Sequence, residues 1–111
     1  MKAIKGQVTI NGVVHPLCIS FKAMRDFEAI TYKQIAEATT TEDNAILGWC
    51  ALKSGANKEK IEFKQTLEEW YDMLDDDFSI LQDVSNAIIE MSEAADPKKK
   101  KAKRATVKAK N

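Results

Sequence analysis

The first part of the chain alternates between apolar and polar residues, which is the period of a β-strand. In the stretch IKGQVTI the apolar residues Ile4, Val8 and Ile10 fall on one side, and a second apolar run, VVHPLCIS, follows Asn11-Gly12. Asn-Gly between two such runs favours a type I′ turn, because both central residues of that turn need a positive φ. The pattern therefore predicts a β-hairpin. The proline in its second run cannot donate to a ladder, so the second strand is expected to lie at an edge or to be broken there.

After Ser20, which is suited to cap a helix, the apolar residues recur every three or four positions, the period of an α-helix. The stretch TTTED predicts the start of a second helix, because a threonine can cap it and the acids favour its positive end. The run AILGWCAL is apolar on nearly every side, so we expect this helix to be central and buried, with Gly48 allowing a neighbour to approach closely. Lys53 and Gly55 predict its C-terminal end.

Two further helices are predicted before a basic tail. Thr66 and Glu69 form a capping box ahead of the third helix, Asp77 can cap the fourth, and Pro97 is expected to stop it. We expect the core to contain these residues: Phe21, Met24, Phe27, Ile30, Ile46, Trp49, Leu52, Leu67, Leu74, Leu81, Val84 and Ile88. The predicted fold class is mainly α, a small helical domain of about four helices with an N-terminal β-hairpin that spans residues 1–97.

The charges divide unevenly between this domain and the end of the chain. The net charge is zero, yet all 17 acidic residues precede residue 98, whereas eight of the 17 basic residues lie in residues 98–111. Like charges repel, so we predict that residues 98–111 form a disordered basic tail. Lysine runs without aromatic residues attract any polyanion and read no base sequence. A small nucleic-acid-associated regulatory protein that uses this tail is therefore an alternative function, and nucleic acid is not expected to be the main partner.

Candidate chemistry is sparse in this sequence. His15 is the only histidine and has no neighbour in the sequence that suggests catalysis. Cys18 and Cys50 lie far apart without a CxxC spacing, which argues against a zinc site and a disulfide scaffold. We therefore expect no enzyme, no metal ligand and no cofactor. No apolar run approaches the roughly 20 residues that span a bilayer, and the N-terminus lacks the apolar region of a secretory signal, so we expect a cytoplasmic protein without a membrane partner.

Several short motifs follow one another in a recognisable order. A hairpin leads into a helix that ends in Phe-Glu…Thr-x-Lys, then comes the helix AILGWCALK, and then TLEEW before an aspartate-rich turn. The residues of these motifs are Phe27, Glu28, Thr31, Lys33, Leu52, Lys53, Thr66, Glu68 and Glu69. With them, residues 4–95 resemble the tail assembly chaperones of long-tailed (siphovirus-type) phages. Tyr32 stands where that family's pattern has glycine, so either tyrosine adopts a strained left-handed helix end or the helix continues through it.

The resemblance implies a non-catalytic protein of the host cytoplasm that is absent from the mature virion. Members of this family bind the long, hydrophobic tape measure protein, keep it soluble and help to recruit tail tube subunits. Amphipathic helices can cover the apolar stripes of such a client, and Trp, Tyr and Met are enriched at interfaces. The candidate partner-binding residues are Trp70, Tyr71, Met73, Ile80, Ala87 and Ile89. A structural tail adaptor that stays in the virion is a further alternative, and self-association is possible.

The lysine run generates a prediction about the gene. Many members of this family are made in two lengths, the longer one by ribosomal slippage near the end of the shorter reading frame. Because lysine codons are AAA or AAG, Lys98–Lys101 can be written as a slippery run. We predict an A-rich heptamer at these codons, overlapping a second frame whose product recruits the tail tube protein. The coding DNA checks this, and interrupted lysine codons without an overlapping frame would contradict it.

Overall fold

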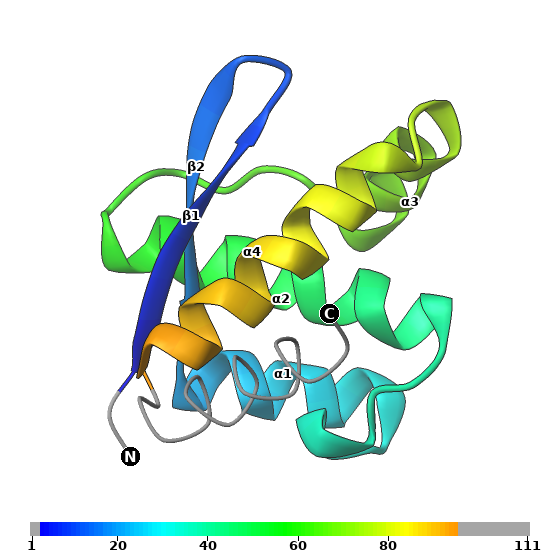
Figure 1. Ribbon diagram of the computed structural model, residues 1–111. Helices are drawn as coiled ribbons and strands as arrows, with labels where there is room; N and C mark the ends of the chain where they lie inside the picture. The colour runs from blue at the N-terminus through cyan, green and yellow to red at the C-terminus, as the bar shows by residue number, and fades with distance from the viewer. Residues whose placement is uncertain (1–2, 96–111) are drawn as a thin grey trace, which may run out of the picture.

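The computed structural model describes residues 3–95, which form a two-stranded antiparallel sheet and four α-helices (Figure 1). The elements in chain order are β1 (Ile4–Ile10), β2 (Val13–Ile19), α1 (Phe21–Thr31), the 3-10 helix η1 (Ile35–Glu37), α2 (Thr41–Lys58), α3 (Leu67–Asp76) and α4 (Ser79–Ala95). The mainly helical fold with an N-terminal hairpin is confirmed. Pro97 and the predicted disordered tail, residues 98–111, lie outside the described residues.

The hairpin forms as its turn sequence predicts. Asn11 and Gly12 have φ values of 50° and 79°, so both central residues of the turn have the positive φ that a type I′ turn requires. Ile10 pairs with Val13 next to the turn, and Gln7 pairs with Pro16 further along. Since the sheet of the described residues has only two strands, β2 is an edge strand, as the proline predicts.

Three of the four α-helices of the described residues begin at predicted caps, whereas Asp77 is the C-cap of α3 and accepts a hydrogen bond from the Ser79 backbone N–H at 3.1 Å at the start of α4. The Ser20 hydroxyl accepts a hydrogen bond from the Ala23 backbone N–H at 3.2 Å and starts α1. In α3 the Thr66 hydroxyl accepts from the Glu69 N–H at 3.1 Å, while the Glu69 carboxylate accepts from the Thr66 N–H at 2.9 Å. The N-cap of α2 is Thr40, which pairs with an acid at the third helical position in the same way. These local bonds satisfy N–H groups that a helix leaves free at its start.

Helix α2 is the central element, but it is longer than the sequence predicts. It runs past Gly55 to Lys58, so the prediction of a C-terminal end at Gly55 is wrong. The glycine serves close packing instead, because a Cβ at Gly55 would overlap the backbone carbonyl of Pro16 in β2. Gly48 has the predicted role, since a Cβ there would lie 3.1 Å from the Val84 side chain of α4.

The core lies around α2, between the hairpin and the other helices. Six of the twelve predicted core residues are buried: Phe27, Ile46, Leu52, Leu74, Leu81 and Val84. Four more are partly buried and pack against that core: Met24, Trp49, Leu67 and Ile88. The remaining two, Phe21 and Ile30, are 74% and 37% exposed, so their assignment to the core is wrong.

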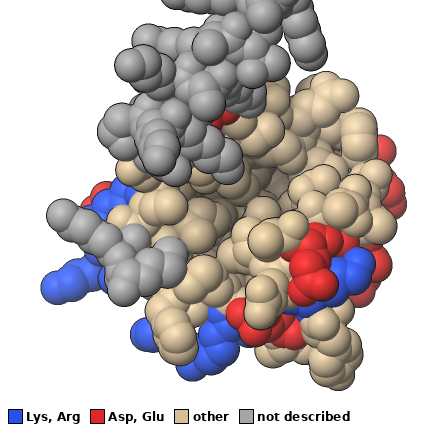
Figure 2. Space-filling view, turned by 60° about the horizontal axis from the view of Figure 1, so that its bottom comes forward, with Lys and Arg blue, Asp and Glu red and all other residues tan. Residues whose placement is uncertain are grey.

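The period of α1 explains both errors. On a helix of 3.6 residues per turn, a residue three positions further along lies about 60° short of a full turn. Apolar residues spaced by three therefore shift steadily around the helix. The buried face of α1 is set by Ala23 and Phe27, and the two ends of the run turn outward. Figure 2 views the molecule more from the side of α1 and shows uncharged side chains over much of its middle, with charged ones mostly towards its edges.

Replacing Gly55 with alanine should destabilise the fold, although alanine is the better helix former by about 1 kcal/mol. The added Cβ would meet the Pro16 carbonyl, which belongs to the backbone and cannot rotate away. We expect a loss of roughly 1–3 kcal/mol in the free energy of unfolding, measured with urea. Asn57→Ala, at an exposed position of the same helix, is the control and should be neutral or stabilising. A Gly55→Ala variant as stable as wild type would contradict the close contact of α2 with β2.

Candidate partner-binding site

Two of the six residues predicted to bind a partner belong to the core. The Trp70 side chain is fully buried, and its indole Nε1 donates a hydrogen bond to the Ala45 carbonyl of α2 at 2.8 Å. Ile80 is 4% exposed. The prediction that these two residues contact a partner is therefore wrong. Trp70 and Leu74 are four residues apart, and this face of α3 is the one that turns inward.

The other four predicted residues do not form one surface. Tyr71, Met73 and Ala87 are partly buried against the core, and Ile89 of α4 is 46% exposed. Met73 lines the groove described next, whereas Tyr71 lies in a separate depression beside Phe78. The structure thus divides the predicted face and retains only Met73 as part of a larger apolar site.

An apolar groove lies between the end of the hairpin and the segment that joins α2 to α3. Its volume is about 600 Å³. Its apolar lining includes Val13 and Val14 of β2, Leu52 and Ala56 of α2, Ile61 and Phe63 of the joining segment, and Met73 of α3. Val13, Val14 and Ile61 are 57%, 56% and 53% exposed. Figure 1 shows the hairpin projecting beyond the helices with the joining segment, in green, passing near it.

Trp49 holds the wall of this groove in place. Its indole Nε1 donates a hydrogen bond to the Gln65 carbonyl at 3.2 Å, and its ring meets the edge of Phe63 with centroids 6.1 Å apart. The Lys53 ammonium lies 5.0 Å from the centroid of the Trp49 ring, within the range of a cation–π contact. Trp49, which the sequence predicts to be core, is therefore half-buried, because it holds the extended segment between α2 and α3 against α2.

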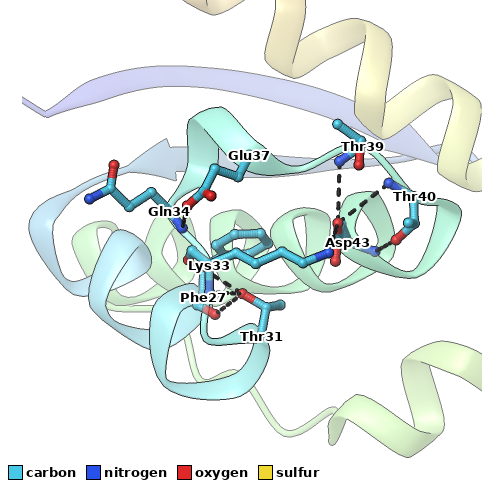
Figure 3. A network of polar contacts seen from close by, with 8 residues as sticks. All are labelled: Phe27, Thr31, Lys33, Gln34, Glu37, Thr39, Thr40 and Asp43. Atoms are coloured by element: carbon cyan, nitrogen blue, oxygen red, sulfur yellow. Dashed lines mark hydrogen bonds and ion pairs between the residues drawn. The ribbon is translucent and has the colours of Figure 1, made fainter.

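A polar network closes the connection between α1 and α2 (Figure 3). The Thr31 hydroxyl donates to the Phe27 carbonyl at 2.8 Å and accepts from the Lys33 N–H at 3.1 Å. The Lys33 ammonium then reaches Asp43 in the first turn of α2, with Nζ 2.9 Å from Oδ2. Three residues of the family-like motif, Phe27, Thr31 and Lys33, thus act together to hold two helices.

Tyr32 takes the left-handed conformation, the first of the two alternatives that the sequence leaves open. Its φ and ψ are 59° and 26°, and its N–H donates to the Glu28 carbonyl at 2.8 Å to end α1. The side chain is 92% exposed, so the ring meets no crowding. A non-glycine residue in this region costs roughly 1–2 kcal/mol, which the neighbouring network must offset.

Asp43 is the most strongly perturbed acid of this network. Its side chain is 6% exposed, and Oδ2 accepts hydrogen bonds from the Lys33 ammonium and from the backbone N–H groups of Thr39 and Thr40, the last two at 3.2 and 3.4 Å. The Lys33 hydrogen bond is the main cause that lowers the pKa of Asp43 from 3.8 to about 2, while burial acts in the opposite direction. The carboxylate is therefore ionised at neutral pH and serves as a structural anchor.

The described residues also bear on metal binding, thiol chemistry and membrane insertion. Within residues 3–95 no group of three or more His, Cys, Asp and Glu side chains is placed to hold a metal ion. Cys18 and Cys50 are buried free thiols, and burial raises the pKa of Cys50 to about 12, so this thiol stays protonated. No helix in the same range combines the length and hydrophobicity needed to cross a bilayer.

Comparison of the chain with models of known families, with curated proteins and with solved structures finds no match. The likeness to tail assembly chaperones accordingly rests on the short motifs of the sequence. Of those motifs, Phe27, Thr31 and Lys33 hold the α1–α2 connection, and Thr66 and Glu69 cap α3. They build the scaffold, and the apolar groove is the surface that this scaffold presents.

Asp43→Asn should destabilise the protein at neutral pH and lose this effect in acid. Because the pKa of Asp43 is lower in the folded protein than its ordinary 3.8, the ionised form stabilises the fold above about pH 4. That contribution disappears as the pH falls from about 4 towards 2. Asparagine keeps the size and one carbonyl oxygen, so the variant removes mainly the charge. Urea midpoints of both proteins should differ at about pH 7, and the difference should shrink below about pH 4 and vanish only below about pH 2.

Asp26→Asn is the matched control for this titration. The Asp26 carboxylate lies 3.4 Å from Arg25 and 4.0 Å from Lys53, and such long, solvent-accessible ion pairs contribute little to stability. Its substitution should leave the urea midpoint nearly unchanged across the pH range. If the Asp43→Asn deficit were the same at every pH, the hydrogen bonds of Asp43, and not its charge, would be what stabilises the connection.

Proposed function

We propose that this protein is a phage tail assembly chaperone that binds the tape measure protein in the apolar groove. The observation that carries the proposal is the groove itself, where Val13, Val14 and Ile61 each leave more than half of their surface exposed around a buried apolar base. Contiguous exposed apolar surface of this kind commonly marks a protein-binding site. The family-like motifs of the sequence supply the identity of the client.

The shape and polarity of the groove suit an amphipathic helix. Such a helix presents apolar side chains at i, i+3 or i+4, and i+7, and buries them in a hydrophobic groove of its partner. The charges at the rim include Glu62 and Lys64, whose side chains pair with each other at 3.9 Å. Because the rim carries charges of both signs, it favours neither a basic nor an acidic client. Apolar contacts would therefore contribute most of the binding. Covering the apolar stripe would keep a long helical client soluble.

The wider role follows the family resemblance. In this proposal the protein acts in the host cytoplasm, helps to recruit tail tube subunits through a longer frameshifted form, and is absent from the mature virion. It performs no catalysis and needs no cofactor. Nucleic acid is not proposed as its main partner, because the groove is apolar and the excess of acidic residues lies in the same domain.

Co-expression with helical fragments of the tape measure protein tests the function. The full chain should bind a fragment and raise its soluble yield. Ile61→Glu places a charge in the groove and should weaken binding by at least about tenfold, which corresponds to about 1.4 kcal/mol. Binding is measured by titration calorimetry, and circular dichroism checks that the variant is folded.

Phe78→Glu is the matched control, because Phe78 is 51% exposed, close to the 53% of Ile61, and lies outside the groove. It should bind the fragment as wild type does. If Phe78→Glu loses binding and Ile61→Glu keeps it, the client binds elsewhere and the site is wrong although the function holds. If no tape measure fragment is bound or solubilised by the wild-type chain, the proposed function fails.

A further inference from the structure

The outer edge of β1 carries backbone groups that point away from the hairpin. The hydrogen bond of the turn joins Ile10 to Val13, and hydrogen-bonded and non-hydrogen-bonded pairs alternate from there along an antiparallel ladder. The N–H and C=O groups of Lys5, Gln7 and Thr9 therefore point outward on β1. No backbone–backbone hydrogen bond among residues 3–95 uses them.

The two edges of the hairpin differ in how they are covered. On β2, Pro16 has no N–H, its carbonyl lies against Gly55 of α2, and Cys18 is buried. On β1, helix α4 packs over one face of the strand, where a Cβ at Gly6 would meet the Met91 side chain, and does not close the edge. Lys5, Gln7 and Thr9 are all exposed. An edge of this length that no other segment of residues 3–95 pairs with is a template for another strand.

We propose that β1 pairs in antiparallel fashion with β1 of a second copy of this chain. When Gln7 lies opposite Gln7 of the second copy, the strands overlap over all of Ile4–Ile10. Each Lys5 then lies opposite Thr9 of the other copy, so no like charges face each other. A register centred on Lys5 would place two ammonium groups opposite each other and pair fewer residues, which is unfavourable. Of these two registers, the one centred on Gln7 pairs more residues and opposes no like charges.

The dimer would have an ordinary symmetric form. Antiparallel pairing of identical strands is isologous, with the two-fold axis perpendicular to the sheet, so α4 of both copies covers the same face. The sheet grows from two strands to four, which adds strand pairing to the helix packing that already stabilises each hairpin. Because the apolar groove runs along β2, pairing through β1 leaves it open, and this inference does not depend on the proposed function.

Sedimentation of the full chain at increasing concentration tests the dimer, and we expect a monomer–dimer equilibrium. Gln7→Pro removes an outward N–H group that forms no hydrogen bond within the hairpin. The hairpin already accommodates a proline at the opposite position, Pro16 of β2. This variant should be monomeric with an unchanged circular dichroism spectrum. Gln7→Thr keeps the N–H and should still dimerise. A wild-type chain that is monomeric at every concentration would overturn the proposal. That outcome includes the case in which another segment of the same chain pairs with the edge of β1.

Cysteine cross-linking reports the register without relying on a proline. Gln7→Cys should form a disulfide-linked dimer under mild oxidation, because directly opposite residues lie about 5.5 Å apart. Thr9→Cys should not, since the two Thr9 positions are four residues out of register, about 13 Å along the strand. The native Cys18 and Cys50 are buried, so the cross-linking of the wild-type chain gives the background level for both variants. Equal cross-linking through position 9, or a dimer that survives Gln7→Pro, would show that the copies meet elsewhere.

Discussion

The contact of α2 with β2 fixes where every other element of the protein lies. At Gly55 the two backbones approach so closely that no Cβ fits. Next to this point, the hydroxyls of Ser20 and Ser54 share a buried hydrogen bond of 2.6 Å, and Ser20 also caps α1. One small region therefore joins the end of the hairpin, the start of α1 and the last turns of α2. The tilt of the hairpin, and with it the opening of the groove, depends on this junction.

The two tryptophans make the same kind of hydrogen bond but stabilise different parts of the fold. Both indoles donate to a backbone carbonyl, Trp70 to Ala45 of α2 and Trp49 to Gln65 of the joining segment. Trp70 is completely enclosed and fastens α3 to the core. Trp49 is half-buried and supports a segment that has no helical or strand hydrogen bonds of its own. The groove thus has a firm wall despite being built partly from irregular chain.

Local signals in the sequence predicted most of the fold. The Asn-Gly turn, the Ser20 cap and the Thr66–Glu69 capping box depend on residues close in the chain, and each forms as expected. The errors arose where tertiary packing decides. Gly55 resembles a helix end, yet its partner is a strand about 40 residues earlier, and no local pattern contains that information. The groove was missed for the same reason, since its lining comes from four separate parts of the chain.

The packing of β1 against α4 also governs the order in which the protein can be completed during synthesis. Gly6 and Met91 lie at opposite ends of the described chain and yet are in direct contact. The ribosome releases the N-terminus first, at about 5–20 residues per second, so the hairpin emerges long before the helix that covers it. The face of β1 that carries Gly6 and the buried Val8 stays uncovered by α4 until that last described helix emerges. A protein that is proposed to cover the apolar surface of another chain thus itself exposes an apolar surface during its synthesis.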